Sequence, residues 1–129
     1  MQNILKRLKT EFSAKQKNGY ILVSFPIVIN IDNGLLDLRV KPNENGYSID
    51  CPRDFFVDAN ARLEYYYNVF EKYDKNYHFN IKLQKGKISK DYSQETNIVN
   101  SINEFVRYII MFDDFIINND VVGHEENFV

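Results

Sequence analysis

The amino-acid sequence predicts a single α+β domain, with helices packed on one face of an antiparallel sheet. Two hairpin signals, Asp-Asn-Gly at residues 32–34 and Asn-Gly at 45–46, separate stretches in which apolar and polar residues alternate. Such turns supply the positive φ angles that tight hairpins need. Other stretches repeat apolar residues at spacings of three and four, the pattern of amphipathic helices. At 129 residues the chain is long enough for one hydrophobic core.

The first element is predicted to be a helix over residues 3–17, because an apolar stripe runs opposite a row of lysines. Gly19 follows as a stop signal. A first strand is predicted over residues 20–25 and a second over 27–31, and Pro26 either breaks the strand or marks an edge of the sheet.

Two more strands complete an antiparallel meander of about four strands. In each of them apolar residues alternate with polar ones, so one face of the sheet is expected to be buried against the helices. The residues predicted to face the core are Leu36, Leu38, Val40, Tyr47, Ile49 and Cys51.

A second helix is predicted from Asp58, its N-cap, to Tyr73. A further strand is predicted over residues 77–83. It forms a hairpin, through a turn at Lys85-Gly86, with a short return strand over 87–90.

The clearest predicted helix covers residues 98–112, because apolar residues follow the three-and-four spacing over four turns. Ser93 is its expected N-cap, and residues 115–117 extend it. The remainder is acidic and lacks periodicity. The sequence therefore predicts one α+β domain over residues 1–117 and an acidic flexible tail over 118–129.

Charge is distributed unevenly along the chain although the net charge is only −2. Residues 1–19 carry five cations and one acid, and residues 82–90 carry four lysines and no acid. From Asp91 onward eight acids accompany one cation, Arg107. Such asymmetry can steer a charged partner, and it is also typical of ordinary solvated faces.

The composition points to a cytoplasmic protein without a cofactor. The one cysteine excludes an internal disulfide. No apolar run approaches the roughly 18 residues of a membrane span, and no apolar signal-peptide segment opens the chain. The 16 asparagines and 14 isoleucines against three alanines indicate an AT-rich gene from a low-GC bacterium, its phage or a mobile element.

The order of elements resembles an uncharacterised domain-of-unknown-function family of low-GC bacteria, phages and mobile elements. The similarity rests on a Gly-aromatic-x-apolar-Asp turn at residues 46–50, followed by a helix at 62–73, a hairpin at 79–88 and an apolar helix at 98–115. Residues 51–53, Cys-Pro-Arg, depart from that pattern, in which a second acid and a glycine are expected. The resemblance implies a genomic neighbourhood of defence and counter-defence genes and no particular activity.

No recognisable reactive centre accompanies these elements. His78 and His124 lack a metal-ligand spacing, so both are expected to be solvated, and no metal site is predicted. Cys51 is expected to be a buried structural thiol. A divergent metal-dependent nuclease would use Asp37 and Asp50 on adjacent strands, but the required Asp/Glu-x-Lys tripeptide is missing there.

Nucleic-acid binding is the alternative that the lysines suggest. The basic first helix and the Lys-rich hairpin would contact phosphates, with Tyr77 or Tyr92 stacking on bases. A pI of about 5.7 argues against it, because phosphate-binding domains are usually basic. The expected hairpin contacts are Lys82, Lys85, Lys87 and Lys90.

The preferred hypothesis is a small non-catalytic protein-binding domain. Its concrete version is an inhibitor of a host defence nuclease, of the anti-CRISPR kind, that occupies a basic groove with an acidic surface. Tyr65 is expected at the interface as an exposed aromatic, and the long apolar helix could also form a homodimer seam. The acidic residues expected to bind are Asp113, Asp114, Asp120, Glu125 and Glu126.

Overall fold

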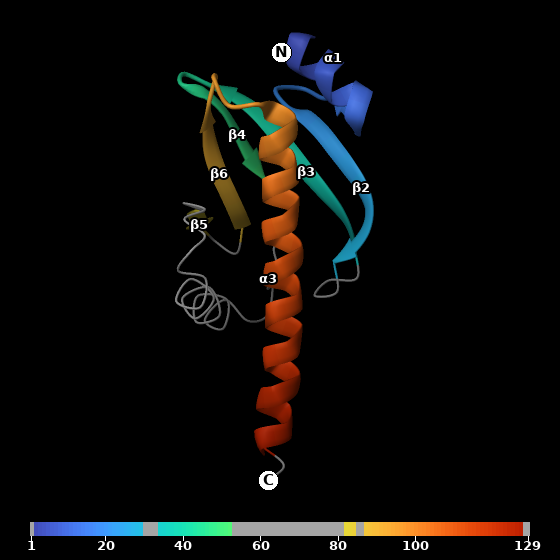
Figure 1. Cartoon of the computed structure of the whole chain (residues 1–129), viewed down its shortest axis with the longest axis vertical. Helices are drawn as coiled ribbons and strands as arrows, with labels where there is room; N and C mark the ends of the chain where they lie inside the picture. The colour runs from blue at the N-terminus through green and yellow to red at the C-terminus, as the bar shows by residue number, and fades with distance from the viewer. Residues whose placement is uncertain (1, 30–33, 53–81, 85–86, 128–129) are drawn as a thin grey trace.

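The centre of the molecule is one antiparallel sheet crossed on one face by a long helix (Figure 1). The computed structural model describes residues 2–29, 34–52, 82–84 and 87–127, and in the last helix it describes side chains as far as Asp114. The elements in chain order are α1 (Gln2–Glu11), β1 (Ser13–Gln16), β2 (Ile21–Ile29), β3 (Gly34–Asn43), β4 (Gly46–Asp50), β5 (Lys82–Gln84), β6 (Lys87–Ser93) and α3 (Ile98–Asn127).

The sheet has six strands in the order β1-β2-β3-β4-β6-β5, and every described pair is antiparallel. The α+β prediction is therefore confirmed. The expected meander of about four strands and the separate hairpin prove to be parts of one sheet, because β6 pairs with β4 over residues 46–50 and 89–93. Sequence periodicity shows that a strand exists but not which edge it joins.

The core lies between the sheet and the first half of α3. Alternate residues of β2, β3, β4 and β6 point toward the helix, and α3 returns a stripe at spacings of three and four. All six residues predicted to face the core are buried, Cys51 among them. The α3 residues packed against the sheet include Ile98, Ile102, Phe105, Tyr108, Ile109 and Phe112. This stripe packs inside the domain, and the homodimer that the sequence suggested stays a prediction.

The N-terminal helix is shorter than predicted. It ends at Glu11, and residues 13–16 form the edge strand β1, paired with the start of β2. Gly19 is not a helix stop: with φ at +86° it lies in the turn that joins β1 to β2. Lys and Gln favour helix in isolation, but pairing with β2 and burial of Ala14 override that preference.

Pro26 does not break the strand; β1 pairs with β2 only as far as Ser24, so the proline lies on an edge stretch, which is the other outcome that the sequence predicts. β2 is continuous from Ile21 to Ile29, with a register irregularity between Ser24 and Val28. A bulge of this kind accommodates proline, since the residue cannot donate a ladder hydrogen bond. The expected turn at residues 32–34 is described only at Gly34, which pairs with Ile29.

The second predicted hairpin is confirmed, with a two-residue turn at Glu44–Asn45 between Asn43 and Gly46. Gly46 is the first residue of β4 and lies against the backbone of β6. A Cβ atom there would overlap the Tyr92 carbonyl and lie 2.6 Å from the Gln94 nitrogen. The close approach of the two strands therefore requires glycine at this position.

The long helix begins at Ile98, as its apolar spacing predicts, but it has a different N-cap from the predicted one and ends later. Asn97, not Ser93, is the N-cap: its Oδ1 accepts hydrogen bonds from the backbone nitrogens of Val99 at 3.0 Å and Asn100 at 3.3 Å. The helix then continues to Asn127, through the stretch for which a tail was expected.

Two predicted elements lie mostly outside the described residues. These are the helix over residues 58–73 and the strand over 77–83, of which the structure describes only its last two residues, within β5 (Lys82–Gln84). The hairpin around Lys85-Gly86 is confirmed by the pairing of Gln84 with Lys87, and its return strand extends to Ser93.

Candidate functional site

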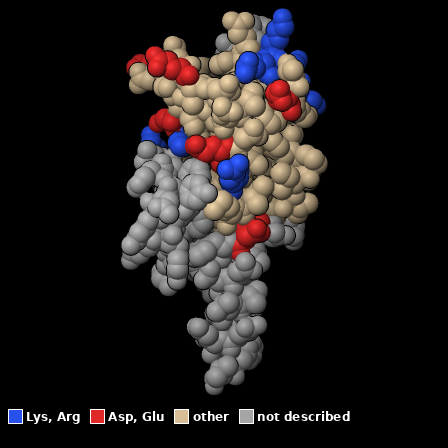
Figure 2. Space-filling model, in the orientation of Figure 1, with Lys and Arg blue, Asp and Glu red and all other residues tan. Residues whose placement is uncertain are grey.

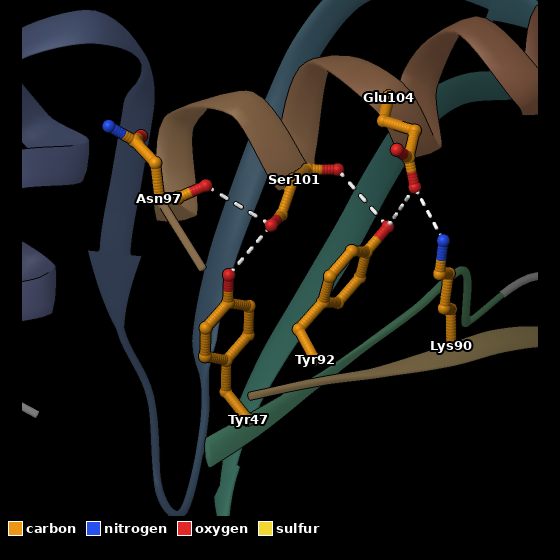
Figure 3. Close-up of polar contacts among 6 residues, drawn as sticks. All are labelled: Tyr47, Lys90, Tyr92, Asn97, Ser101 and Glu104. Carbon is orange, nitrogen blue, oxygen red and sulfur yellow. Dashed lines mark hydrogen bonds and ion pairs between the residues drawn. The ribbon is translucent and has the colours of Figure 1, made fainter. Parts of the chain in front are cut away.

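A polar cluster joins the sheet to the start of α3, which we call the Tyr–Glu cluster (Figure 3). Its members are Tyr47, Lys90, Tyr92, Ser101 and Glu104. The register of β4 and β6 sets Tyr47 opposite Tyr92, and the two rings stack with centres 5.4 Å apart and planes 15° apart. Both rings project from the helix-facing side of the sheet toward α3.

Both hydroxyls of the pair reach Ser101 of α3, Tyr92 through the Ser101 carbonyl at 3.4 Å, and Tyr92 also reaches Glu104. Tyr47 donates a hydrogen bond of 2.7 Å to the Ser101 Oγ, and that hydroxyl donates in turn to the Asn97 carbonyl at 3.1 Å. Tyr92 lies 3.1 Å from Glu104 Oε1, to which it donates. The cluster therefore connects two neighbouring strands to the first two turns of the helix.

Lys90 completes the cluster from β6. Its Nζ atom lies 2.6 Å from Glu104 Oε1 and 4.9 Å from the centre of the Tyr92 ring. The lysine side chain is 15% exposed and the glutamate side chain 42%. This ion pair is thus partly shielded from water, unlike a pair on an open surface.

The environment raises the pKa of Tyr92 strongly, first because the hydroxyl is buried and then because Glu104 is a negative neighbour that accepts its hydrogen bond. Burial also raises the pKa of Tyr47, with the hydrogen bond to Ser101 acting in the opposite direction. Both phenols therefore remain protonated near neutral pH, where they are donors in bonds already made. The hydrogen bonds and the ion pair of the cluster fasten α3 to the sheet.

The sequence did not predict that Lys90 and Tyr92 join the sheet to α3. Lys90 was expected to contact nucleic acid, but it faces the helix with Ile88 and Tyr92. Tyr92 was expected to stack on bases, but it is only 8% exposed. The alternation of Ile88, Lys90 and Tyr92 was the available signal, because alternate residues of a strand share one face.

The opposite face of the sheet carries a second ion-pair group. Arg39 on β3 donates two hydrogen bonds to Asp50 on β4, at 3.0 and 2.6 Å, and also lies over the Tyr20 ring. Lys41 lies 3.9 Å from the same carboxylate. A bidentate guanidinium partner fixes a carboxylate geometrically.

This arrangement bears on the nuclease hypothesis. Arg39 occupies both oxygens of Asp50, and Asp37 pairs in register with Ser24 rather than with Asp50. Over the described ranges, no group of three or more His, Cys, Asp or Glu residues is placed to hold a metal ion. The described geometry of Asp37 and Asp50 therefore gives no support to a metal-dependent nuclease site.

The hairpin lysines do not form one basic surface. Lys82 pairs with Asp91 at 2.7 Å, Lys87 is exposed, and Lys90 points inward. Lys85 lies outside the described residues.

The acidic residues are also divided by the structure. Asp113 is only 3% exposed, so the prediction that it belongs to a partner-binding surface is wrong. Asp114 is exposed, and Asp120, Glu125 and Glu126 belong to α3 by their backbone. Tyr65 and His78 lie outside the described residues, whereas His124 falls within α3.

A third charged region lies at the end of the molecule that carries α1, where Lys and Arg side chains gather (Figure 2). We call it the basic N-terminal surface. All of its cations are exposed: Lys6, Arg7, Lys9, Lys15 and Lys17. A shallow hollow of about 370 Å³ runs along α1, lined by Asn3, Lys6, Arg7, Thr10 and Glu11.

No protein-family model matches the chain, and searches of curated proteins and of solved structures return no match. The resemblance to a low-GC bacterial family therefore stays a prediction. Within the described residues, neither helix has the length and apolar character needed to cross a membrane.

Proposed function

We propose that the protein is a non-catalytic binding domain that attaches to a basic groove of a partner protein through the acidic helix end. We define the acidic helix end as Asp114, Asp120, Glu125 and Glu126. The main support is that α3 runs as one helix from Ile98 to Asn127 and so carries all four residues. Its C-terminal half continues past the ends of the strands (Figure 1).

Helix electrostatics add to this support. The C-terminus of a helix carries partial negative charge, so an acid in the last turn destabilises the helix by roughly 0.3–1 kcal/mol. Glu125 and Glu126 lie in that last turn, and no Lys or Arg follows Arg107 in the sequence. Acids that oppose local stability are often retained for a function.

The proposed partner is a protein that normally binds nucleic acid. A rod of negative charge complements a groove lined with Lys and Arg, and electrostatic complementarity favours rapid and selective association. An inhibitor of a defence nuclease is the specific form of this proposal, because it combines the charge with the AT-rich composition of the gene.

The proposal is tested by binding to an RNA-guided nuclease from a low-GC bacterium, measured by biolayer interferometry. The triple variant Asp114→Asn, Asp120→Asn and Glu125→Gln should bind about tenfold or more weakly than the unaltered protein, a loss of about 1.4 kcal/mol.

The matched control neutralises three exposed acids elsewhere, Glu11→Gln, Glu44→Gln and Glu95→Gln. It should keep its affinity within about twofold, because it changes net charge equally but leaves the helix unaltered. Equal loss in both variants, or no binding by the unaltered protein, would remove the proposal.

A further inference from the structure

The basic N-terminal surface gathers five cations, in contrast to the ion-pair groups described above. Arg39, Lys41, Lys82 and Lys90 each form an ion pair with an acid. None of the five cations of the basic N-terminal surface forms an ion pair with any residue that the structure describes. From this contrast we infer that the surface binds the phosphate backbone of double-stranded nucleic acid, an activity separate from that of the acidic helix end.

The cations are held on ordered, consecutive elements. Lys6, Arg7 and Lys9 lie on the outer side of α1, while Leu8 on its inner side is fully buried in the core. Lys15 lies on β1. The backbone nitrogen of Lys17 donates a 2.8 Å hydrogen bond to the Tyr20 carbonyl. Because the backbone that carries the cations is already ordered, only their side chains lose conformational entropy when they meet a regular row of phosphates.

The acidic pI of the whole chain does not oppose this site. The C-terminal half of α3, which carries most of the acidic helix end, lies toward the opposite end of the molecule from α1 (Figure 1). A helix of 30 residues is about 45 Å long. Charges are screened over about 8–10 Å at physiological salt, so a phosphate at α1 experiences the local cations and not the average over the chain.

Glu11 is the acid nearest in sequence to these cations and lines the same hollow as Lys6 and Arg7. Its carboxylate repels phosphate and lowers the affinity of the site. Neutralising it should therefore strengthen binding, which a protein made unstable by mutation would not do.

The neighbouring rings favour a duplex over a single strand. Single-strand binding proteins stack bases on exposed aromatic rings. Here Phe12 packs edge to face on Phe25 at 5.6 Å between ring centres, and Arg39 lies over the Tyr20 ring. The apolar side of α1 is packed into the core, so it is not available for insertion into a membrane.

The test measures binding of the full chain to a labelled DNA duplex of about 20 base pairs by fluorescence anisotropy, between about 50 and 200 mM salt. The variant Lys6→Gln, Arg7→Gln, Lys9→Gln should bind at least about tenfold more weakly. Its log–log salt slope should fall by about 2.7, which is 0.9 for each phosphate that the variant no longer neutralises. Glu11→Gln should bind more tightly than the unaltered protein.

The matched control is Lys41→Gln, Lys82→Gln, Lys87→Gln, which lowers net charge by the same amount at other sites. Binding within about twofold of the unaltered protein is expected for it. The inference is overturned if the unaltered protein fails to bind duplex at low salt, or if both triple variants lose affinity equally. Binding of a single strand or of anionic vesicles as tightly as the duplex would overturn it as well.

Discussion

Tyr92 shows how one side chain can connect three parts of this fold. Its ring stacks on Tyr47, its face receives the Lys90 ammonium group, and its hydroxyl donates to Glu104. A buried phenol without a partner would cost about 1–3 kcal/mol, and the carboxylate removes that cost. The side chain thus adds both apolar area and a directional bond to the contact between sheet and helix.

This environment predicts a loss of stability in alkali. An unfolded tyrosine ionises near its ordinary pKa of 10.0, whereas the pKa of folded Tyr92 is raised well above that value. The stabilisation is complete below pH 10.0 and is lost as the pH rises further, because only the unfolded chain then releases the proton. We expect the free energy of unfolding to fall by up to about 1.4 kcal/mol per pH unit for this residue.

Urea unfolding on either side of pH 10 measures this slope, and Tyr92→Phe is the comparison. The variant should be less stable by about 1–2 kcal/mol at neutral pH, because it loses the bond to Glu104, and its alkaline slope should be shallower. Identical slopes for the two proteins would show that Tyr92 does not titrate as we describe.

At the scale of elements, the beginning of α3 depends on the amide of Asn97. Replacing Asn97 with Ala should lower the free energy of unfolding by about 1 kcal/mol, because two backbone nitrogens lose their acceptor. Ser93→Ala should have a smaller effect, since the Ser93 hydroxyl contacts the Thr96 hydroxyl and no helix nitrogen. Circular dichroism during urea unfolding measures both, and equal losses would contradict the cap assignment.

Element type was easier to predict from the sequence than element ends. Alternation in β3 and β4 identified six buried residues correctly, because period-two patterns follow directly from strand geometry. The division of residues 3–17 into α1 and β1 was missed, since β1 is held by cross-strand pairing with residues 21–24, a contact that the propensity of residues 13–16 alone does not contain. The cap was misplaced for a similar reason, as both Ser93 and Asn97 are suitable residues.

The candidate sites were less predictable than the fold. Charge counts along the chain identified the basic N-terminal segment and the acidic C-terminal one, and both remain as surfaces for which we propose partners. They did not reveal that Asp113 is buried or that Lys82 and Lys90 have acidic partners. Pairing of this kind depends on strand register and helix placement, which composition does not specify.

At the scale of the whole molecule, the order of strands sets the expected pattern of local stability. β3 and β4 are paired on both sides, whereas β1 and β5 are edges of only four and three residues. Amides of the central strands should therefore exchange with deuterium most slowly and those of the edge strands β1 and β5 fastest among the described strands. Hydrogen-exchange mass spectrometry measures this, and protection of β1 equal to that of β3 would contradict the topology.

The division of α1 into an inward apolar side and an outward charged side has an evolutionary consequence. Leu8 anchors the helix in the core, while its solvent-facing positions contribute almost nothing to packing. Substitutions at these positions can accumulate, or reverse the charge of the side chain, with little effect on the stability of the fold. A few substitutions on this side of α1 can thus change which charged partners the chain binds, while the fold stays the same.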